Sequence, residues 1–209
     1  MILSMAALLW MRCSIEGRRV KGDNMAPAIN IGDIVIFDIS SYRLGSPFQR
    51  GQIVLFYPYY LHVQPDDLNA NFMNVVNRAV GPPSLISPEA SIKRVIALPG
   101  ERVEVKRNEG VFINGKLLNE PYVKEPATYD LHQLKDMGGL LNLNRGLVCP
   151  YPGRAETIVV PPDSLFVLGD NRNESEDSHQ WGFLKQNRVI GKAAFVSLPV
   201  LHIFSNPNY

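Results

Sequence analysis

The sequence predicts a mostly β protein, and three observations support this fold class. The chain has 209 residues, among them 16 Gly and 16 Pro, which interrupt helices and mark turns. Short runs rich in β-branched residues recur along it, such as IGDIVIFDI at residues 31–39. Asn114-Gly115 lies between two apolar runs and predicts a hairpin, because a type I′ turn requires positive φ at both central positions. The length allows one large or two small domains around a substantial core.

The first part of the chain predicts an extended segment followed by two strands. Residues 14–25 are expected to run extended and to bring Asn24 to the end of a strand. Residues 31–39 alternate between apolar and polar side chains, which is the pattern of a half-buried strand. Residues 50–60, RGQIVLFYPYY, repeat this arrangement and predict a second strand.

Two segments have the composition of insertions, approximately residues 61–90 and 124–157. The first is rich in Asp, Asn and Pro on either side of residues 72–80, FMNVVNRAV. In this nonamer the apolar residues Phe72, Val75, Val76 and Ala79 recur at helical spacing and would share one face of a helix. We expect a short surface helix there, with a strand pair as the alternative. The second is rich in Gly, Leu and Asn.

Between and after these insertions the strand pattern returns. Residues 92–100, 101–107 and 110–122 predict successive strands, the last of them folded at the Asn114-Gly115 hairpin. Residues 159–171, VVPPDSLFVLGDN, predict a buried strand that ends in a polar turn. Residues 189–204 are again apolar and predict the final strand.

Charge and cysteine content exclude several classes of function. The formal net charge is +1 with no basic block, so the sequence does not predict nucleic-acid binding. Cys13 and Cys149 have no neighbours with metal-ligand spacing, so we expect no metal site and no cofactor. We expect two free or buried thiols, although a disulfide remains open in an oxidising compartment.

Three motifs in order resemble those of the type I signal peptidases. Residues 20–29 read VKGDNMAPAI, residues 91–101 read SIKRVIALPGE, and residues 169–183 read GDNRNESEDSHQWGF. This family consists of membrane-bound proteases with a serine nucleophile and a lysine general base. The resemblance covers nearly the whole chain and implies an antiparallel, barrel-like β fold with insertions. The second motif is intact, and the third departs from the family pattern at His179, where arginine is usual.

The first motif lacks its nucleophile. Asn24 stands where the family has serine, and Ala28 stands where it has threonine. A carboxamide has no hydroxyl that a base can activate, so the acyl-enzyme route is closed at this position. Asn24 has three interpretations: a structural residue in a family member that has lost activity, a substitution introduced for study, or a nucleophile through its own amide. Because Ala28 and His179 have also changed, we favour natural loss of activity.

The resemblance assigns roles to residues of the second and third motifs. Lys93 matches the general base, which must be desolvated to be neutral at working pH. Ser175 matches the serine that orients this lysine. Arg94 is expected to face away from Lys93 and to pair with Asp170. Asp177 and residue 179 match a supporting ion pair, which we expect His179 to weaken above neutral pH. Without the resemblance, Lys93 and Arg94 would be ordinary surface residues of a strand.

Other positions match the substrate-binding parts of the family. The backbone donors of the oxyanion hole correspond to Gly22 and Asn24. Apolar residues match the wall of shallow pockets that accept the small −1 and −3 side chains of an Ala-x-Ala signal peptide: Val20, Met25, Ile29 and Ile92. Each of them alone is typical of a core. Together they predict a groove that holds an extended peptide by strand addition.

The N-terminus is a candidate membrane anchor over residues 1–12, followed by a β domain over residues 13–209. Its apolar run is too short for a spanning helix, which needs about 20 residues. A truncated start, a tilted or interfacial anchor and a helix that inserts with a partner are all open, as is a short core segment. We expect a membrane-associated protein with its β domain on the extracytoplasmic or lumenal side.

The sequence thus predicts a signal peptidase I-like protein that recognises signal peptides or preproteins with little or no proteolysis. Two alternatives remain. One is an active Ser-Lys enzyme whose serine is absent only from this sequence. The other is a non-catalytic binding or structural subunit of a membrane protein complex.

Overall fold

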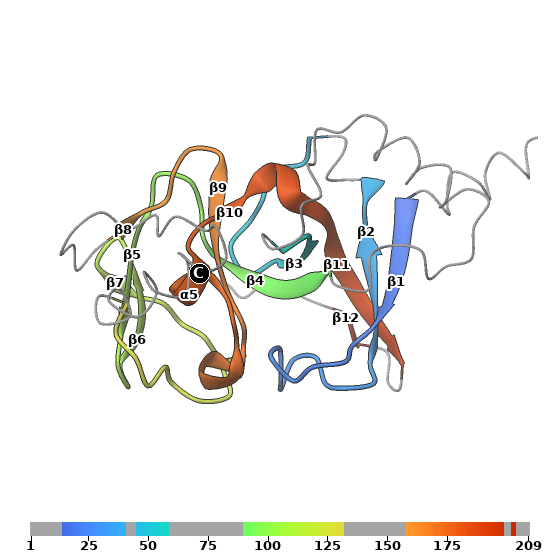
Figure 1. The fold of residues 1–209 in the computed structure, drawn as a ribbon, viewed down its shortest axis with the longest axis horizontal. Helices are drawn as coiled ribbons and strands as arrows, with labels where there is room; N and C mark the ends of the chain where they lie inside the picture. The colour runs from blue at the N-terminus through green and yellow to red at the C-terminus, as the bar shows by residue number, and fades with distance from the viewer. Residues whose placement is uncertain (1–13, 41–44, 59–89, 132–157, 199–201, 204–209) are drawn as a thin grey trace, which may run out of the picture.

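Two antiparallel sheets make up the described part of the chain, in agreement with the predicted mostly β class (Figure 1). The structure is a computed structural model, and it describes residues 14–40, 45–58, 90–131, 158–198 and 202–203. The strands are β1 (Ile15–Arg19), β2 (Ile34–Asp38), β3 (Ile53–Phe56), β4 (Ser91–Ala97), β5 (Arg102–Lys106), β6 (Gly110–Ile113), β7 (Lys116–Leu117), β8 (Ile158–Val159), β9 (Ser164–Leu168), β10 (Leu184–Lys185), β11 (Val189–Leu198) and β12 (His202–Ile203). Three short helical turns follow β9: η1 (Arg172–Glu174), α5 (Ser178–Trp181) and η2 (Gln186–Arg188).

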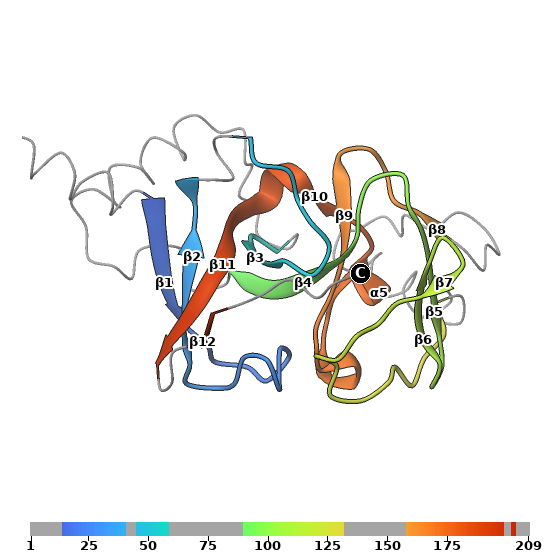
Figure 2. The ribbon, with the colours of Figure 1, turned by 180° about the vertical axis from the view of Figure 1, so that it is seen from behind.

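The larger sheet joins both ends of the described chain. Its strand order is β1-β2-β11-β3-β4-β9-β10, and β12 pairs with β11. The predicted final strand therefore lies between β2 and β3 in the middle of the sheet, which Figure 2 shows from behind. β3 is buried along its whole length, with Ile53 and Leu55 in one core cluster and Val54 and Phe56 in another. A strand with apolar neighbours on both faces reads as a continuous apolar run, as the sequence does here.

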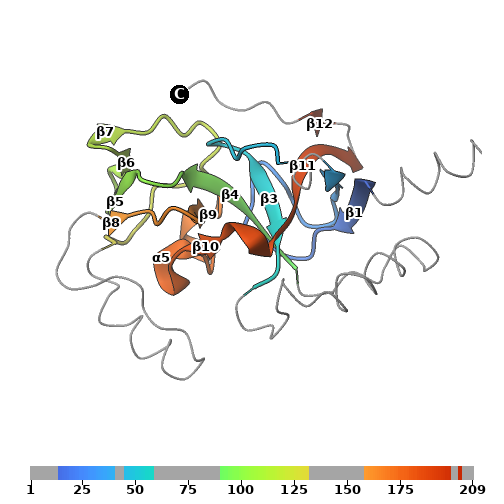
Figure 3. The ribbon, with the colours of Figure 1, turned by 90° about the horizontal axis from the view of Figure 1, so that it is seen from above.

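The smaller sheet has the order β7-β6-β5-β8 and packs against β9. Its β6–β7 connection is the predicted hairpin, with φ of 52° at Asn114 and 79° at Gly115. Core residues of this half include Ala127 and Leu131, which belong to the start of the second predicted insertion. Figure 3 shows α5 beside β9, next to the smaller sheet.

Several predicted segments lie outside the described residues. These are the apolar run at residues 1–12, nearly all of the first predicted insertion, and residues 132–157 of the second. Within the ranges that the structure describes, no helix combines the length and the apolar character that crossing a membrane requires.

Candidate functional site

The polar turn after β9 folds back on itself and meets the segment that carries Asn24. The backbone N–H of Gly169 donates to Asp177 Oδ2 at 2.8 Å, and that of Asn171 donates to the carbonyl oxygen of Asn24 at 3.1 Å. The turn requires glycine at 169, because a Cβ there would lie 2.3 Å from Ser175 Oγ and 2.5 Å from the Asn24 carbonyl oxygen. The first and third motifs, which are distant in sequence, are therefore in direct contact.

Lys93 lies in β4 and points into this turn. Its side chain is buried, and its Nζ donates to Ser175 Oγ at 2.8 Å. Burial lowers the pKa of the Lys93 amine, against the opposing influence of the carboxylates of Asp177, Glu176 and Asp170. An amine with a lowered pKa, oriented by a hydroxyl, has the chemistry of a general base.

Ser175 links Lys93 to a buried carboxylate. Its hydroxyl accepts from Lys93 and donates to Asp177 Oδ2 at 2.6 Å. Burial alone would raise the pKa of the Asp177 carboxyl, but His179, Lys93 and the Ser175 hydroxyl together hold it below its ordinary value of 3.8. The Ser175 hydroxyl thus donates its proton to the Asp177 carboxylate, while its oxygen accepts a hydrogen bond from Lys93.

His179 extends the chain of hydrogen-bonded side chains formed by Lys93, Ser175 and Asp177. Its Nδ1 lies 2.6 Å from Asp177 Oδ1, and its backbone N–H donates to the same oxygen at 3.2 Å. The Tyr129 ring stacks on the imidazole at a centroid distance of 4.2 Å and an interplanar angle of 18°. Burial, followed by the charge of Asp177, raises the pKa of the Tyr129 hydroxyl. Sequence reasoning did not identify Tyr129, because it falls in a segment with the composition of an insertion.

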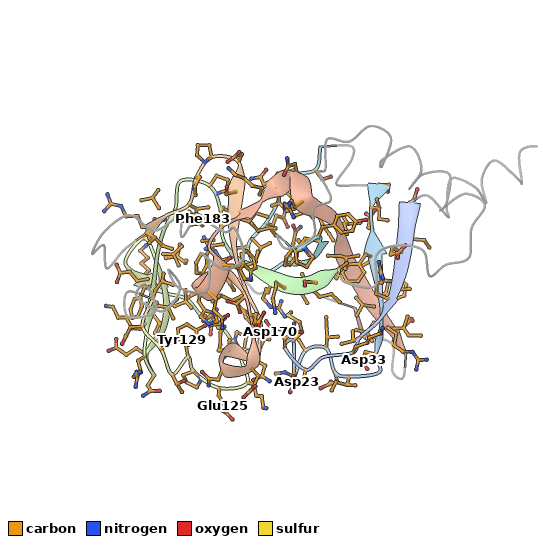
Figure 4. The ribbon with its side chains drawn as sticks, viewed as in Figure 1. Asp23, Asp33, Glu125, Tyr129, Asp170 and Phe183 are labelled. Carbon is orange, nitrogen blue, oxygen red and sulfur yellow. The ribbon has the colours of Figure 1, made fainter. Side chains whose placement is uncertain are left out.

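Arg94 braces β4 against the same turn. Its guanidinium donates to both carboxylate oxygens of Asp170, at 2.8 and 2.6 Å, and to the carbonyl oxygen of Gly51 at 2.8 Å. The Tyr122 ring lies 4.0 Å below the guanidinium carbon. The structure thus brings Arg94 and Asp170 together, as the resemblance predicts. Figure 4 shows Asp170 beside the segment that carries Asp23, and the neighbouring Asn171 side chain donates to the Asp23 carbonyl oxygen.

A second buried ion pair was not expected from the sequence. Arg172 donates from two guanidinium nitrogens to the carboxylate of Glu120, and its Nε donates to the carbonyl oxygen of Gly169 at 3.1 Å. Arg172 belongs to the third motif, whereas Glu120 follows β7. The pair fixes the turn to the smaller sheet.

A groove runs from Asn24 along β1, and we call it the β1–β4 groove. It has a volume of about 550 Å³ and is lined by residues 17–22, Asn24, Leu55 and residues 90–92. Among the described strands, β1 pairs only with β2, and β9 pairs with β4 from Arg94 onward. Two strand edges that no other described strand covers therefore border the groove, and such edges accept an additional extended chain.

The predicted pocket residues divide into two pairs. Val20 and Ile92 line the β1–β4 groove. Met25 and Ile29 are fully buried in the same core cluster and are not among the lining residues. Gly22 and Asn24, the predicted oxyanion positions, line the end of the groove. Apolar character does not separate these pairs, because a core and a peptide pocket both require it.

Metal ligation has no support in the described part of the chain, where no three His, Cys, Asp or Glu side chains gather with suitable spacing. The site consists of hydrogen-bonded side chains around one lysine.

Known proteins resemble this chain along most of its length. The family described as "Signal peptidase, peptidase S26" matches residues 1–198. "Probable signal peptidase I-2" of Synechocystis sp. is 34% identical over 185 residues, which are 88% of this chain but 64% of that protein. "Probable signal peptidase I-1" of the same organism is 35% identical over 200 residues, 95% of this chain and 79% of that protein. The crystal structure of a signal peptidase I from Enterococcus faecalis V583 is 28% identical, covers 70% of this chain and 96% of that chain, and has a TM-score of 0.41.

Proposed function

The chain belongs to the signal peptidase family, peptidase S26, and we propose that it binds signal-peptide-like segments in the β1–β4 groove without cleaving them. The observation that carries this proposal is the position of the groove. It lies between two open strand edges and ends at Asn24, where the family has its nucleophile.

Loss of cleavage follows from the chemistry of residue 24. Lys93 Nζ donates to Ser175 Oγ at 2.8 Å, which suits a base, but the carboxamide of Asn24 offers such a base no hydroxyl to deprotonate. Ser175 is a poor substitute, because it is 5% exposed and its proton is held by Asp177. Backbone donors near Gly22 and Asn24 would still polarise a bound carbonyl, which contributes to binding more than to turnover.

Binding would resemble the addition of a strand. Main-chain hydrogen bonds to β1 and β4 would supply most of the affinity, and the walls at Val20 and Ile92 would accept small side chains. An isolated peptide of this kind would bind with a dissociation constant of roughly micromolar size.

The same proposal places the protein at a membrane. Residues 1–12 would contact lipid or a membrane partner, with the β domain on the extracytoplasmic or lumenal side. Its partners would be the signal peptides of preproteins, and a fixed subunit of a membrane protein complex is the alternative occupant of the groove.

Peptide binding and cleavage by the purified full chain test this function together. A labelled Ala-x-Ala signal peptide should bind without being cut, and Ile92→Asp should abolish binding because it places a charge in the groove wall. Ile31→Asp is the matched control, since Ile31 is 65% exposed and outside the groove. Cleavage at the Ala-x-Ala site that Lys93→Ala abolishes would disprove the pseudoenzyme, and the absence of any binding would disprove recognition.

A further inference from the structure

Charged residues, as well as apolar ones, form the wall of the β1–β4 groove. Along β1 the side chains alternate, so that Glu16, Arg18 and Val20 share the inner face while Arg19 is exposed on the other. Of the two predicted pocket residues that line the groove, Val20 is the nearer to Asn24 in sequence. The next inward residue back along the strand is therefore an arginine, where a purely apolar pocket would require an aliphatic or aromatic side chain.

Arg18 is held in place but is not fully satisfied. Its Nε lies 3.0 Å from Glu16 Oε1, and the two side chains are 17% and 9% exposed. Within the described residues, the buried Nε and Nη2 of Arg18 make no hydrogen bond of good geometry. A buried charged donor that lacks a well-aligned acceptor is unfavourable, and turning the guanidinium toward an acceptor supplied in the groove would remove that cost.

The spacing of β1 matches the spacing of an extended peptide. Side chains two apart on a strand lie on one face and are about 6.6 Å apart, and the same holds for the −1 and −3 residues of a bound peptide. If the −1 side chain lies against Val20, the −3 side chain of a peptide aligned with β1 lies against Arg18.

The charge around the groove favours an acidic partner. Arg18, Arg19 and Lys21 all line it, and no Asp or Glu is among its described lining residues. We propose that Arg18 is a specificity determinant and that the groove binds peptides with a hydrogen-bond acceptor at −3, an aspartate or glutamate above all, more tightly than it binds Ala-x-Ala peptides. This inference rests on the proposed function, because it names the substrate class of the same groove.

Three signal-peptide analogues that differ only at −3 test the proposal on the purified full chain. Each has Ala at −1, and position −3 is Ala, Asn or Asp. We expect the Asp peptide to bind about tenfold or more tightly than the Ala peptide, with the Asn peptide between them. Arg18→Met should remove this ranking. Arg102→Met is the matched control, because it removes an exposed arginine outside the groove and should preserve the ranking.

The double variant Glu16→Gln/Arg18→Met covers the case in which Arg18→Met unfolds because Glu16 loses its ion pair with Arg18. It removes both charges of this ion pair and should show the same loss of ranking. Equal binding of all three peptides to the unmodified chain would overturn this inference alone. A ranking that survives in Arg18→Met, or that is also lost in Arg102→Met, would overturn it too. If none of the three peptides binds, the proposed function fails and this inference fails with it.

Discussion

Lys93 Nζ donates a hydrogen bond of 2.8 Å to Ser175 Oγ, although the two residues are 82 positions apart in the sequence. The bond joins β4 to the turn after β9, and it is buried. Its geometry depends on the close approach at Gly169 and on the ion pairs of Arg94 and Arg172 on either side.

The Lys93 amine should make folding stability depend on pH. Its folded-state pKa lies below the ordinary value of 10.5, so the unfolded chain binds more protons between these two values. The free energy of unfolding should therefore rise with pH across that window, by about 1.4 kcal/mol for each unit by which the pKa is lowered. Urea unfolding from about pH 7 to about pH 10 measures the slope. Lys93→Met should flatten it, and an unchanged slope in this variant would contradict the lowered pKa.

Restoring the hydroxyl at residue 24 should restore cleavage. Lys93 and Ser175 are already hydrogen bonded, so Asn24→Ser supplies the group that the proposed base lacks. We expect a gain in signal-peptide cleavage on the order of 10³ or more, in Asn24→Ser or in Asn24→Ser/Ala28→Thr. The control adds Lys93→Ala to the active variant and should abolish the gain. If neither variant cleaves, the site has lost more than its nucleophile.

Gly169→Ala should disrupt the turn. The added methyl group would meet Ser175 Oγ at 2.3 Å and the Asn24 carbonyl oxygen at 2.5 Å, which forces one of them to move. We expect a loss of about 2 kcal/mol in the free energy of unfolding. Gly22→Ala is the matched control, because a Cβ there meets nothing within 4 Å. Equal stability of the two variants would show that the close approach does not constrain the turn.

Removing His179 should shift acid unfolding to higher pH. Asp177 has a lowered pKa, so its stabilising effect is complete above 3.8 and is lost as the pH falls through the lowered value. His179→Ala removes one cause of that lowering and leaves a buried carboxylate, at a cost of about 2 kcal/mol or more near neutral pH. Circular dichroism during acid titration gives the midpoint. His179→Arg, the usual family residue, should keep the original midpoint, and a loss like that of His179→Ala would contradict the ion-pair interpretation.

Breaking the buried ion pair of Arg172 and Glu120 should lower the free energy of unfolding more than breaking an exposed ion pair does. Arg172→Met leaves Glu120 charged and nearly buried, and we expect a loss of about 3 kcal/mol. Lys185→Met breaks a pair whose side chains are 46% and 69% exposed, and it should cost much less stability than Arg172→Met because solvent screens the exposed charges. Chemical denaturation of both variants makes the comparison, and similar losses would contradict the structural role of Arg172.

The sequence by itself determined the local features of this protein. Alternation of side chains predicted β2 and β3, and Asn114-Gly115 predicted the β6–β7 hairpin, because both depend on neighbours within a few residues. Residue type and spacing within a motif are visible along the chain, so the three motifs also indicated Lys93, Ser175, Arg94 and Asp170 as candidate site residues.

The tertiary structure decided which elements meet. Strand alternation specifies a buried face but not a partner, so the place of β11 between β2 and β3 could not be predicted from the residues. Tyr129 on His179 and Glu120 on Arg172 are contacts between distant segments without a local signal. Val20 and Ile92 line the groove, whereas the equally apolar Met25 and Ile29 lie in the core. The exposure of an apolar side chain depends on the packing of the whole sheet and not on the side chain itself.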